Sequence, residues 1–210
     1  MTSIGEACYA ECDNVTAVSF YGAVEEFPKD CFKNCPKLLR PGGTATAYNA
    51  LKRIGDGAFE GCTALASANH AWNLGIYPNL EYIGDGAFAG ALAAPYKTDV
   101  ALAASLAHIG AGAFDGCTGL TSVTLQTEMP PELGANAFVN MAEDFQIVAP
   151  DGAYDAYLAA LTGSIGIDAA RVMLHNPNAQ AAEEAAAEAE PVADAEAQAA
   201  AGVDAATGAD

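Results

Sequence analysis

The chain has 210 residues, of which 52% are hydrophobic, and its 27 Asp and Glu against 8 Lys and Arg give a formal net charge of −19 at pH 7. This acidity excludes nucleic acids and anionic membranes as favoured partners, because their phosphates carry the same sign of charge. No run of about 18 apolar residues is present to span a bilayer. Residues 1–6 lack both the basic and the apolar region of a secretory signal. From the sequence as given we expect a soluble cytoplasmic chain without membrane insertion.

A short phrase recurs along most of the chain and centres on an aromatic residue. Its clearest copies lie at 54–62 (Ile-Gly-Asp-Gly-Ala-Phe-Glu-Gly-Cys), 83–90 and 109–117, and weaker copies lie at 4–9, 27–32 and 133–138. In chain order the aromatic anchors are Tyr9, Phe32, Phe59, Phe88, Phe114 and Phe138. They follow one another in steps of 23, 27, 29, 26 and 24 residues. A period of this length predicts a solenoid, in which each coil buries its apolar face only against its neighbours.

The residues around each anchor keep fixed types. Five positions before the anchor lies an apolar residue, at Ile4, Phe27, Ile54, Ile83, Ile109 and Leu133. Three positions after it lies Cys12, Cys35, Cys62 or Cys117, with Ala91 and Met141 as the exceptions. Six positions after it an alternating run begins, clearest at 15–20 and 120–125. The β-branched residues of these runs predict strands that are entered from a turn.

The consensus of these columns, Ile-Gly-x-x-Ala-Phe-x-x-Cys-x-x-Leu-x-x-Val-x-Leu, resembles the BspA-like leucine-rich repeat family over residues 4–150. The resemblance implies an α/β-type leucine-rich repeat solenoid. We expect a short, curved, right-handed stack of about six coils, with a parallel sheet on one face, loops or 3₁₀ turns on the other and a C-terminal capping helix. Two units depart from the pattern: Pro-Gly-Gly at 41–43 interrupts one strand, and the unit of Phe88 has an ill-defined strand near Ala94. Strand pairing is therefore in question at those two coils.

The segment after the last anchor predicts how the repeats end. Residues 145–150 predict a last strand, and residues 151–161 predict a helix with Asp151 as its N-cap and Gly163 as its stop signal. Helical spacing places four apolar side chains on one face, namely Tyr154, Tyr157, Leu158 and Leu161.

These observations divide the chain into three parts. Residues 1–150 form the predicted solenoid and residues 151–178 the C-terminal helical cap. Residues 179–210 are rich in Ala and Glu, and no Lys or Arg follows Arg171. Such a segment is unable to bury enough surface to offset its ordering entropy, so we expect a disordered acidic tail.

The first repeat begins at Ile4, which leaves no room for an N-terminal cap. Terminal repeats normally need a polar outer face, so the first coil is expected to expose an apolar end and a strand edge. Two explanations stay open: either further coils precede this one, or the end pairs with another chain. The second gives the hypothesis of a homodimer through the N-terminal coil, with Ile4 and Val15 at the contact.

No motif in the sequence predicts catalysis. The glycines of each repeat, such as Gly55, Gly57 and Gly61, are not spaced as in the dinucleotide fingerprint and no long helix follows them. We assign them to tight turns that need a positive φ. The histidines, His70, His108 and His175, are not paired with a nucleophile at a recognisable spacing. We therefore expect no enzymatic activity and no cofactor.

The six cysteines leave three interpretations open. Cys8 and Cys31 share one repeat column, and Cys12 and Cys35 share another. Because neighbouring coils stack at about 4.8 Å, each pair is near disulfide range, and the four sulfurs are close enough to consider a zinc site. Cys62 and Cys117 occupy the second column without a companion in the first. This favours buried thiols that are present for packing, so no metal is expected.

Two surfaces are candidates for contact with a protein partner of unknown identity. The first is the small, polar outward face of the strands, formed by Thr16, Ser19, Arg40, Ser67, Asn69, Thr121, Ser122 and Thr124. The second is the bulge of the two longest repeats and the step that follows them, which holds Tyr48, His70, Trp72, Tyr77, Tyr96 and Lys97. Aromatic side chains dominate binding hot spots, which favours the bulge. The alternative is that its rings fold inward to cover an irregular coil.

The resemblance implies a protein-interaction module. In the family, adhesion to host or bacterial surface proteins is the usual role, and many members are secreted or surface-attached, which contrasts with the missing signal peptide. The alternative is a cytoplasmic or fragmentary structural repeat protein that self-associates through its uncapped N-terminal coil.

Overall fold

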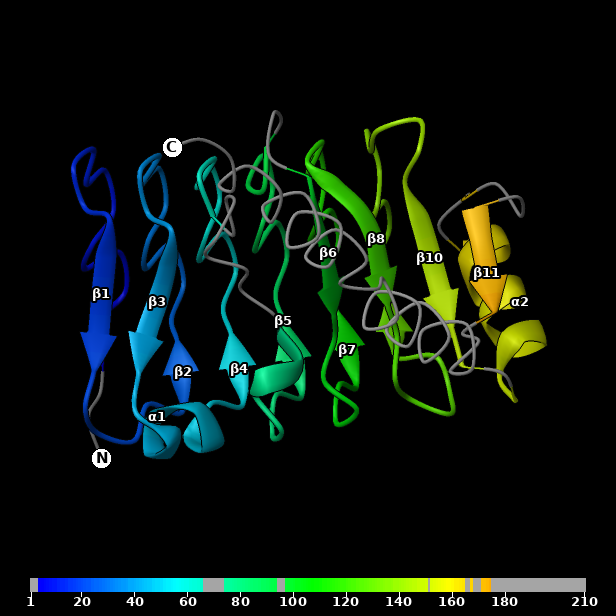
Figure 1. The fold of residues 1–210 in the computed structure, drawn as a ribbon, viewed down its shortest axis with the longest axis horizontal. Helices are drawn as coiled ribbons and strands as arrows, with labels where there is room; N and C mark the ends of the chain where they lie inside the picture. The colour runs from blue at the N-terminus through cyan, green and yellow to red at the C-terminus, as the bar shows by residue number, and fades with distance from the viewer. Residues whose placement is uncertain are drawn as a thin grey trace, which may run out of the picture. The chain divides into compact units, whose positions relative to one another are not determined.

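The computed structural model describes residues 4–65, 74–93, 97–150, 152–164, 167 and 171–174. All of them lie in a first compact unit, Met1–His175. Within that unit the strands lie side by side and are joined by turns, as expected for stacked coils (Figure 1).

The longer strands form two parallel sheets. The first pairs β1 (Ala17–Phe20) with β3 (Arg40–Gly43). The second has the order β11-β10-β8-β6, with bounds Val172–Leu174, Gln146–Ala149, Leu120–Thr124 and Thr98–Ala101. Each coil of a repeat returns to the same side before its strand begins, so successive strands run in the same direction.

Both coils with questionable pairing form paired strands. The Pro-Gly-Gly segment is part of β3, which pairs with β1 over four residues even though Pro41 has no N–H to donate. Hydrogen bonds at both ends hold it: the Leu39 amide donates to Thr16 and the Thr44 amide to Phe20. In the unit of Phe88, β6 pairs with β8 through a register shift at its first residue. Ala94 lies outside the described residues.

A second kind of strand was not predicted. The residue pairs that begin each repeat phrase form a parallel sheet in the order β2-β4-β5-β7-β9. Their bounds are Glu26–Phe27, Arg53–Ile54, Tyr82–Ile83, His108–Ile109 and Glu132–Leu133. This side therefore has a sheet in addition to the expected turns, and among the described residues one 3₁₀ helix, η1, spans Leu74–Ile76.

The core is built from columns of equivalent side chains. The six anchor rings, Tyr9 to Phe138, stack on one another with centroid distances of 5.1 to 5.4 Å and planes within 13° of parallel. Beside them lie the isoleucines that open each phrase, of which Ile54, Ile83 and Ile109 are fully buried. Each coil thus covers the apolar face of the next, as the repeat pattern predicts.

The turns around the anchors are themselves hydrogen-bonded from coil to coil. Between two central coils the amides of Gly57, Phe59 and Gly61 donate to the carbonyls of Asp85, Ala87 and Ala89 at 2.7 to 2.9 Å. Gly57 and Gly61 have positive φ values of 60° and 72°, as predicted. Asp30, Asn34, Asn136 and Asn140 adopt the same conformation in other coils without glycine.

The first glycine of each phrase is required for a different reason, which is the close approach of a neighbouring backbone. A Cβ added to Gly110 would lie 2.4 Å from the carbonyl carbon of Gly84, and one added to Gly84 would lie 2.6 Å from the amide nitrogen of Asp56. Neither residue has a positive φ, so the assignment of these glycines to left-handed turns is wrong. The phrase needs glycine here because two backbones approach too closely for any side chain.

The described part of the unit also contains two α-helices. The first, α1, spans Ala45–Ala50 and has Thr44 as its N-cap. The Thr44 hydroxyl accepts a hydrogen bond from the amide of Ala47. The second, α2 (Tyr154–Ser164), packs against β9 and β11. It buries Tyr157 and Leu161 completely, while Tyr154 and Leu158 are partly buried against the core, as the helical spacing predicts.

The end of the repeat region differs from the prediction in two ways. Gly163 lies inside α2 and does not end it, because the helix continues to Ser164. The strand at 146–149 is not the last, since β11 follows α2 and pairs in parallel with β10. The segment 151–178 therefore contains a strand as well as the predicted helix. Asp151, the predicted N-cap, lies outside the described residues.

Candidate interaction surface

The outward strand face is polar but is only partly described. Thr16, directly before β1, is exposed, as are Ser19 and Arg40 on the β1–β3 sheet. Thr121 and Thr124 are half-buried on β8. Ser67 and Asn69 lie outside the described residues. On β8, the hydroxyls of Thr121 and Ser122 both donate to one carboxylate oxygen of Asp99 on β6. These hydroxyls are thus already occupied within the protein.

Lys97 lies at the edge of this face in an ion pair. Its ammonium group is 2.9 Å from the carboxylate of Asp144, and the hydrogen bond holds the pKa of Asp144 below its usual range. Both side chains are about half exposed, so the pair contributes little to stability and leaves Lys97 accessible.

Tyr77 was predicted to lie on the surface of the aromatic bulge, but its side chain is buried. This ring is 2% exposed and packs edge to face against Tyr48, with a centroid distance of 5.5 Å. The hydroxyl of Tyr48 in turn accepts a hydrogen bond from the amide of Gly43. The prediction of Tyr77 as a contact residue is therefore wrong, because the ring folds inward to cover the long coil. His70, Trp72 and Tyr96 lie outside the described residues.

A row of five side chains crosses the five-stranded sheet β2-β4-β5-β7-β9, which we call the narrow sheet. Each strand contributes one side chain. We call this row the stacked column; in strand order it contains Glu26, Arg53, Tyr82, His108 and Glu132. The Arg53 guanidinium lies 3.8 Å from the Tyr82 ring centroid, and the Tyr82 and His108 rings are parallel at 4.5 Å. Carboxylates close both ends: Glu26 lies 3.6 Å from Arg53, and Glu132 lies 3.1 Å from His108.

The stacked column is accessible and preassembled. The side chains of Arg53 and Glu26 are about half exposed, and Glu132 is 81% exposed. Exposed ion pairs and cation–π contacts contribute about 1 kcal/mol or less each, so stability alone does not explain the arrangement. Residues that are already held in place lose little entropy when a partner binds them.

This column lies outside the predicted repeat phrase, which begins at the isoleucine. The signal lies one position earlier, six residues before each anchor. There five of the six coils carry a large polar or aromatic residue, whereas the first coil carries Ser3.

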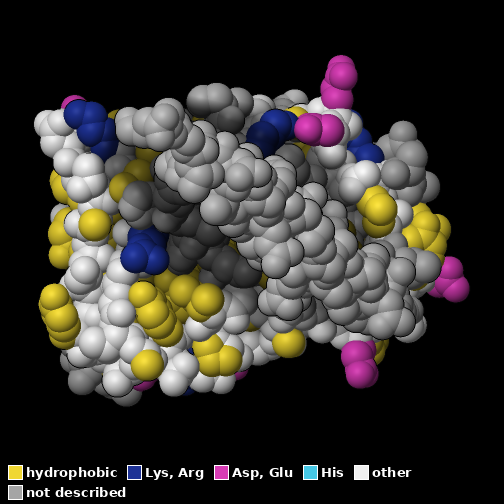
Figure 2. All heavy atoms as spheres, in the orientation of Figure 1, with side chains coloured by type: hydrophobic (Ala, Val, Ile, Leu, Met, Phe, Trp, Pro, Cys, Tyr) yellow, Lys and Arg dark blue, Asp and Glu magenta, His cyan; other side chains and the backbone are white. Residues whose placement is uncertain are grey.

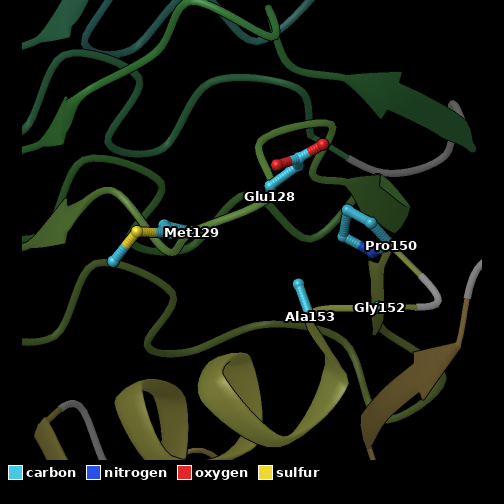
Figure 3. Close-up of a pocket in the computed structure, with 5 residues that line it drawn as sticks. All are labelled: Glu128, Met129, Pro150, Gly152 and Ala153. Carbon is cyan, nitrogen blue, oxygen red and sulfur yellow. The ribbon is translucent and has the colours of Figure 1, made fainter.

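The structure also has a shallow pocket, shown in Figure 3. It is lined by residues of the loops that follow β8 and β10, namely Glu128, Met129, Pro150, Gly152 and Ala153. Of these five, Glu128 alone is ionisable, so the described lining residues contain no acid–base pair. Within the described part of the chain, no group of three or more His, Cys, Asp or Glu could hold a metal ion.

Comparison with known proteins identifies the repeat. A family model, the BspA type leucine rich repeat region, matches residues 1–93 and 44–153 and contains six copies. The chain belongs to the BspA-type leucine-rich repeat family. BspA-type repeats are typically non-enzymatic modules that mediate interactions between proteins. No curated protein matches the chain. Among its described helices, none is long and apolar enough to cross a membrane.

The cysteine column of the BspA-type phrase has a structural role in this chain. The thiols of Cys35, Cys62 and Cys117 each donate to the carbonyl of the anchor in an earlier coil, at 2.9 to 3.0 Å. All three are buried and free. Burial raises the pKa of Cys62 to about 12 and also raises the pKa of Cys117. These thiols are therefore protonated donors with little nucleophilic character.

Alkaline pH is expected to destabilise the fold through these thiols. The unfolded Cys62 thiol loses its proton near pH 9, while the folded one keeps it to about pH 12. Stability is thus fully present below pH 9 and falls above it, by about 1.4 kcal/mol per pH unit for one such thiol. Urea unfolding from pH 8 to 11 measures the slope, which we expect to be smaller in Cys62→Ala. Equal slopes for the two proteins would refute this role of Cys62.

Proposed function

We propose that this chain is an adhesion module that binds a protein on the surface of a host cell or of another bacterium. The family supports a protein-interaction role, and the stacked column is the observation that carries the choice of surface. We further propose that residues 151–178 close the stack and that residues 179–210 are an acidic tail.

The chemistry of the stacked column suits recognition of a protein. Tyr and Arg are the side chains enriched in binding hot spots, and here Arg53 and Tyr82 are adjacent and hold each other in position. The glutamates at the two ends accept hydrogen bonds and favour a partner with basic groups around an apolar centre. The net charge of −19 attracts the same kind of partner over a longer range.

Labelled full-length chain, added to cultured epithelial cells and to intact bacteria, tests this proposal. We expect saturable binding that is lost when surface proteins of the cells are removed by protease. Tyr82→Ala and Arg53→Ala are each expected to weaken binding about tenfold or more. Lys37→Ala is the matched control, since it removes the same charge from an exposed side chain whose hydrogen bond is to Asn14.

The outcomes separate the two candidate surfaces. If Lys97→Ala weakens binding and Tyr82→Ala does not, the partner docks on the outward strand face. Binding that survives protease treatment of the cells would exclude a protein receptor.

One observation favours the alternative, self-association. Several apolar side chains of the first coil are only partly buried against the core, whereas the equivalent residues of central coils are fully buried; they are Ile4, Tyr9, Cys12, Val15, Val18 and Phe20. Within the described chain, β1 pairs with β3 alone. In Figure 2 hydrophobic side chains gather along the left margin, on the side where Figure 1 shows β1. A second copy of the chain would cover this edge.

Charged residues at this edge are expected to abolish self-association. Ile4→Asp and Val15→Asp would place a carboxylate in the contact, where desolvation costs several kcal/mol. Sedimentation over a range of concentrations measures the mass, and we expect a dimer that becomes a monomer in both variants. Ala156→Asp, on the exposed face of α2, adds the same charge elsewhere and should leave the dimer intact. A wild-type monomer at high concentration would exclude this alternative.

A further inference from the structure

The repeat column directly before the anchor contains two cysteines that the packing does not require. In four coils this position is alanine, at Ala58, Ala87, Ala113 and Ala137, and each of these residues is fully buried. Only the first two coils carry Cys8 and Cys31 instead. These are neighbouring coils, so the two exceptions face each other across one coil-to-coil contact.

The two sulfur atoms are held close together. The Sγ atoms of Cys8 and Cys31 are 3.8 Å apart. The Tyr9 amide donates to the carbonyl of Cys31 at 2.9 Å, and the stacked rings of Tyr9 and Phe32 follow directly in the chain. Paired backbones at the strand spacing of about 4.8 Å fall within the Cα separations at which disulfides form.

The two thiols differ in access. Cys8 is exposed, whereas Cys31 is fully buried behind it. Burial, together with the neighbouring Cys8, raises the pKa of the Cys31 thiol. The second cysteine column differs, because the thiol of Cys35 donates to the carbonyl of Tyr9 and is occupied there. Cys8 is thus the thiol that a reagent in solution reaches, and Cys31 is the thiol next to it.

From this geometry we propose that Cys8 and Cys31 are an oxidation site, at which a reversible disulfide joins the first coil to the second. The oxidant is a small disulfide such as oxidised glutathione. The Cys8 thiolate attacks one sulfur of the oxidant and releases one glutathione thiolate, which takes up the proton that Cys8 has lost. The Cys31 thiol then loses its proton and attacks Sγ of Cys8. The bond from Cys8 to glutathione breaks, and the second glutathione leaves as a thiolate that takes up this proton. Two protein thiols are oxidised, and one glutathione disulfide is reduced to two thiols.

The disulfide would act on the least supported part of the unit. Within the described chain the first coil packs against one neighbouring coil, whereas central coils pack against two. The bond closes a loop between positions 23 residues apart and so prevents separation of the first coil from the second.

Peptide mapping of the full chain, equilibrated with oxidised glutathione and blocked with iodoacetamide, tests the proposal. We expect a linked pair in which the tryptic peptide that contains Cys8 is joined to the peptide of residues 30–33. Two of the six thiols should be lost, and dithiothreitol should restore them. Cys31→Ala introduces the alanine that four other coils have in this column, so the variant should fold. In this variant the reaction should stop at a glutathione adduct on Cys8. Cys12→Ala should form the linked pair as the wild type does.

Three results would overturn the proposal. They are a glutathione adduct on Cys8 that persists in the wild type, a link from Cys8 to Cys12, and retention of all six thiols. Each would show that the contact between Cys8 and Cys31 does not proceed to a bond.

Discussion

Replacing Gly110 with alanine is expected to lower the free energy of unfolding by about 3 kcal/mol, the upper end of what overpacking costs. The added methyl would lie 2.4 Å from the carbonyl carbon of Gly84 and 2.5 Å from the amide nitrogen of Asp85. Both atoms belong to the backbone of the neighbouring coil. The amides of Gly86, Phe88 and Gly90 tie that coil to the next at 2.7 to 2.9 Å, so it is unable to yield without loss of hydrogen bonds.

Gly90→Ala is the matched control, because it adds the same methyl group to the neighbouring phrase. Gly90 has a φ of 64°, and nothing lies within 4 Å of its added Cβ. The only cost is an alanine in the left-handed region, about 1 kcal/mol. Urea unfolding of the two variants therefore separates close approach from backbone conformation. If Gly90→Ala proved as costly as Gly110→Ala, conformation and not coil spacing would explain the first glycine.

Truncation of a central ring is expected to have an effect at least as large. Phe59 is fully buried, and its ring stacks on Phe32 at 5.2 Å and on Phe88 at 5.4 Å. Phe59→Ala should lower the free energy of unfolding by about 3 to 5 kcal/mol. Because each coil contacts only its neighbours, the loss should also divide the stack and turn one unfolding transition into two.

Urea unfolding followed by circular dichroism measures both effects. Tyr21→Ala serves as the control, since it removes an aromatic ring that is 84% exposed and should change stability by less than about 0.5 kcal/mol. A loss below about 1 kcal/mol in Phe59→Ala would mean that the ring stack does not hold the coils together.

The sequence predicts the columns of the repeat well, because each column recurs in every coil. The anchors, the isoleucines and the strands at 120–124 and 146–149 were identified in this way. The narrow sheet was missed because its strands have only two residues, too few to show a period. The strand at 40–43 was doubted because proline and glycine disfavour strands, but hydrogen bonds that its flanking amides donate to the adjoining chain of β1 outweigh that preference.

The candidate surface was harder to predict than the fold. The stacked column contains four residue types in five coils, so no consensus marks it. Its order arises from contacts between residues about 25 positions apart, such as Tyr82 with His108. Tyr77 was assigned to the surface because an insertion was assumed to project outward, whereas its ring fills the space beneath the longer coil.

The coil-to-coil hydrogen bonds of the anchor turns have a consequence for how such a chain changes over generations. Each turn donates its amides to the following turn and accepts from the preceding one at equivalent atoms, as at Phe32, Phe59 and Phe88. A duplication or deletion of one whole period therefore joins a donor to an equivalent acceptor and leaves none unpaired. A duplication or deletion of only part of a period does not join equivalent donors and acceptors. The molecule is thus permissive to recombination in complete units, and its length is a variable that mutation can alter without redesign of the core.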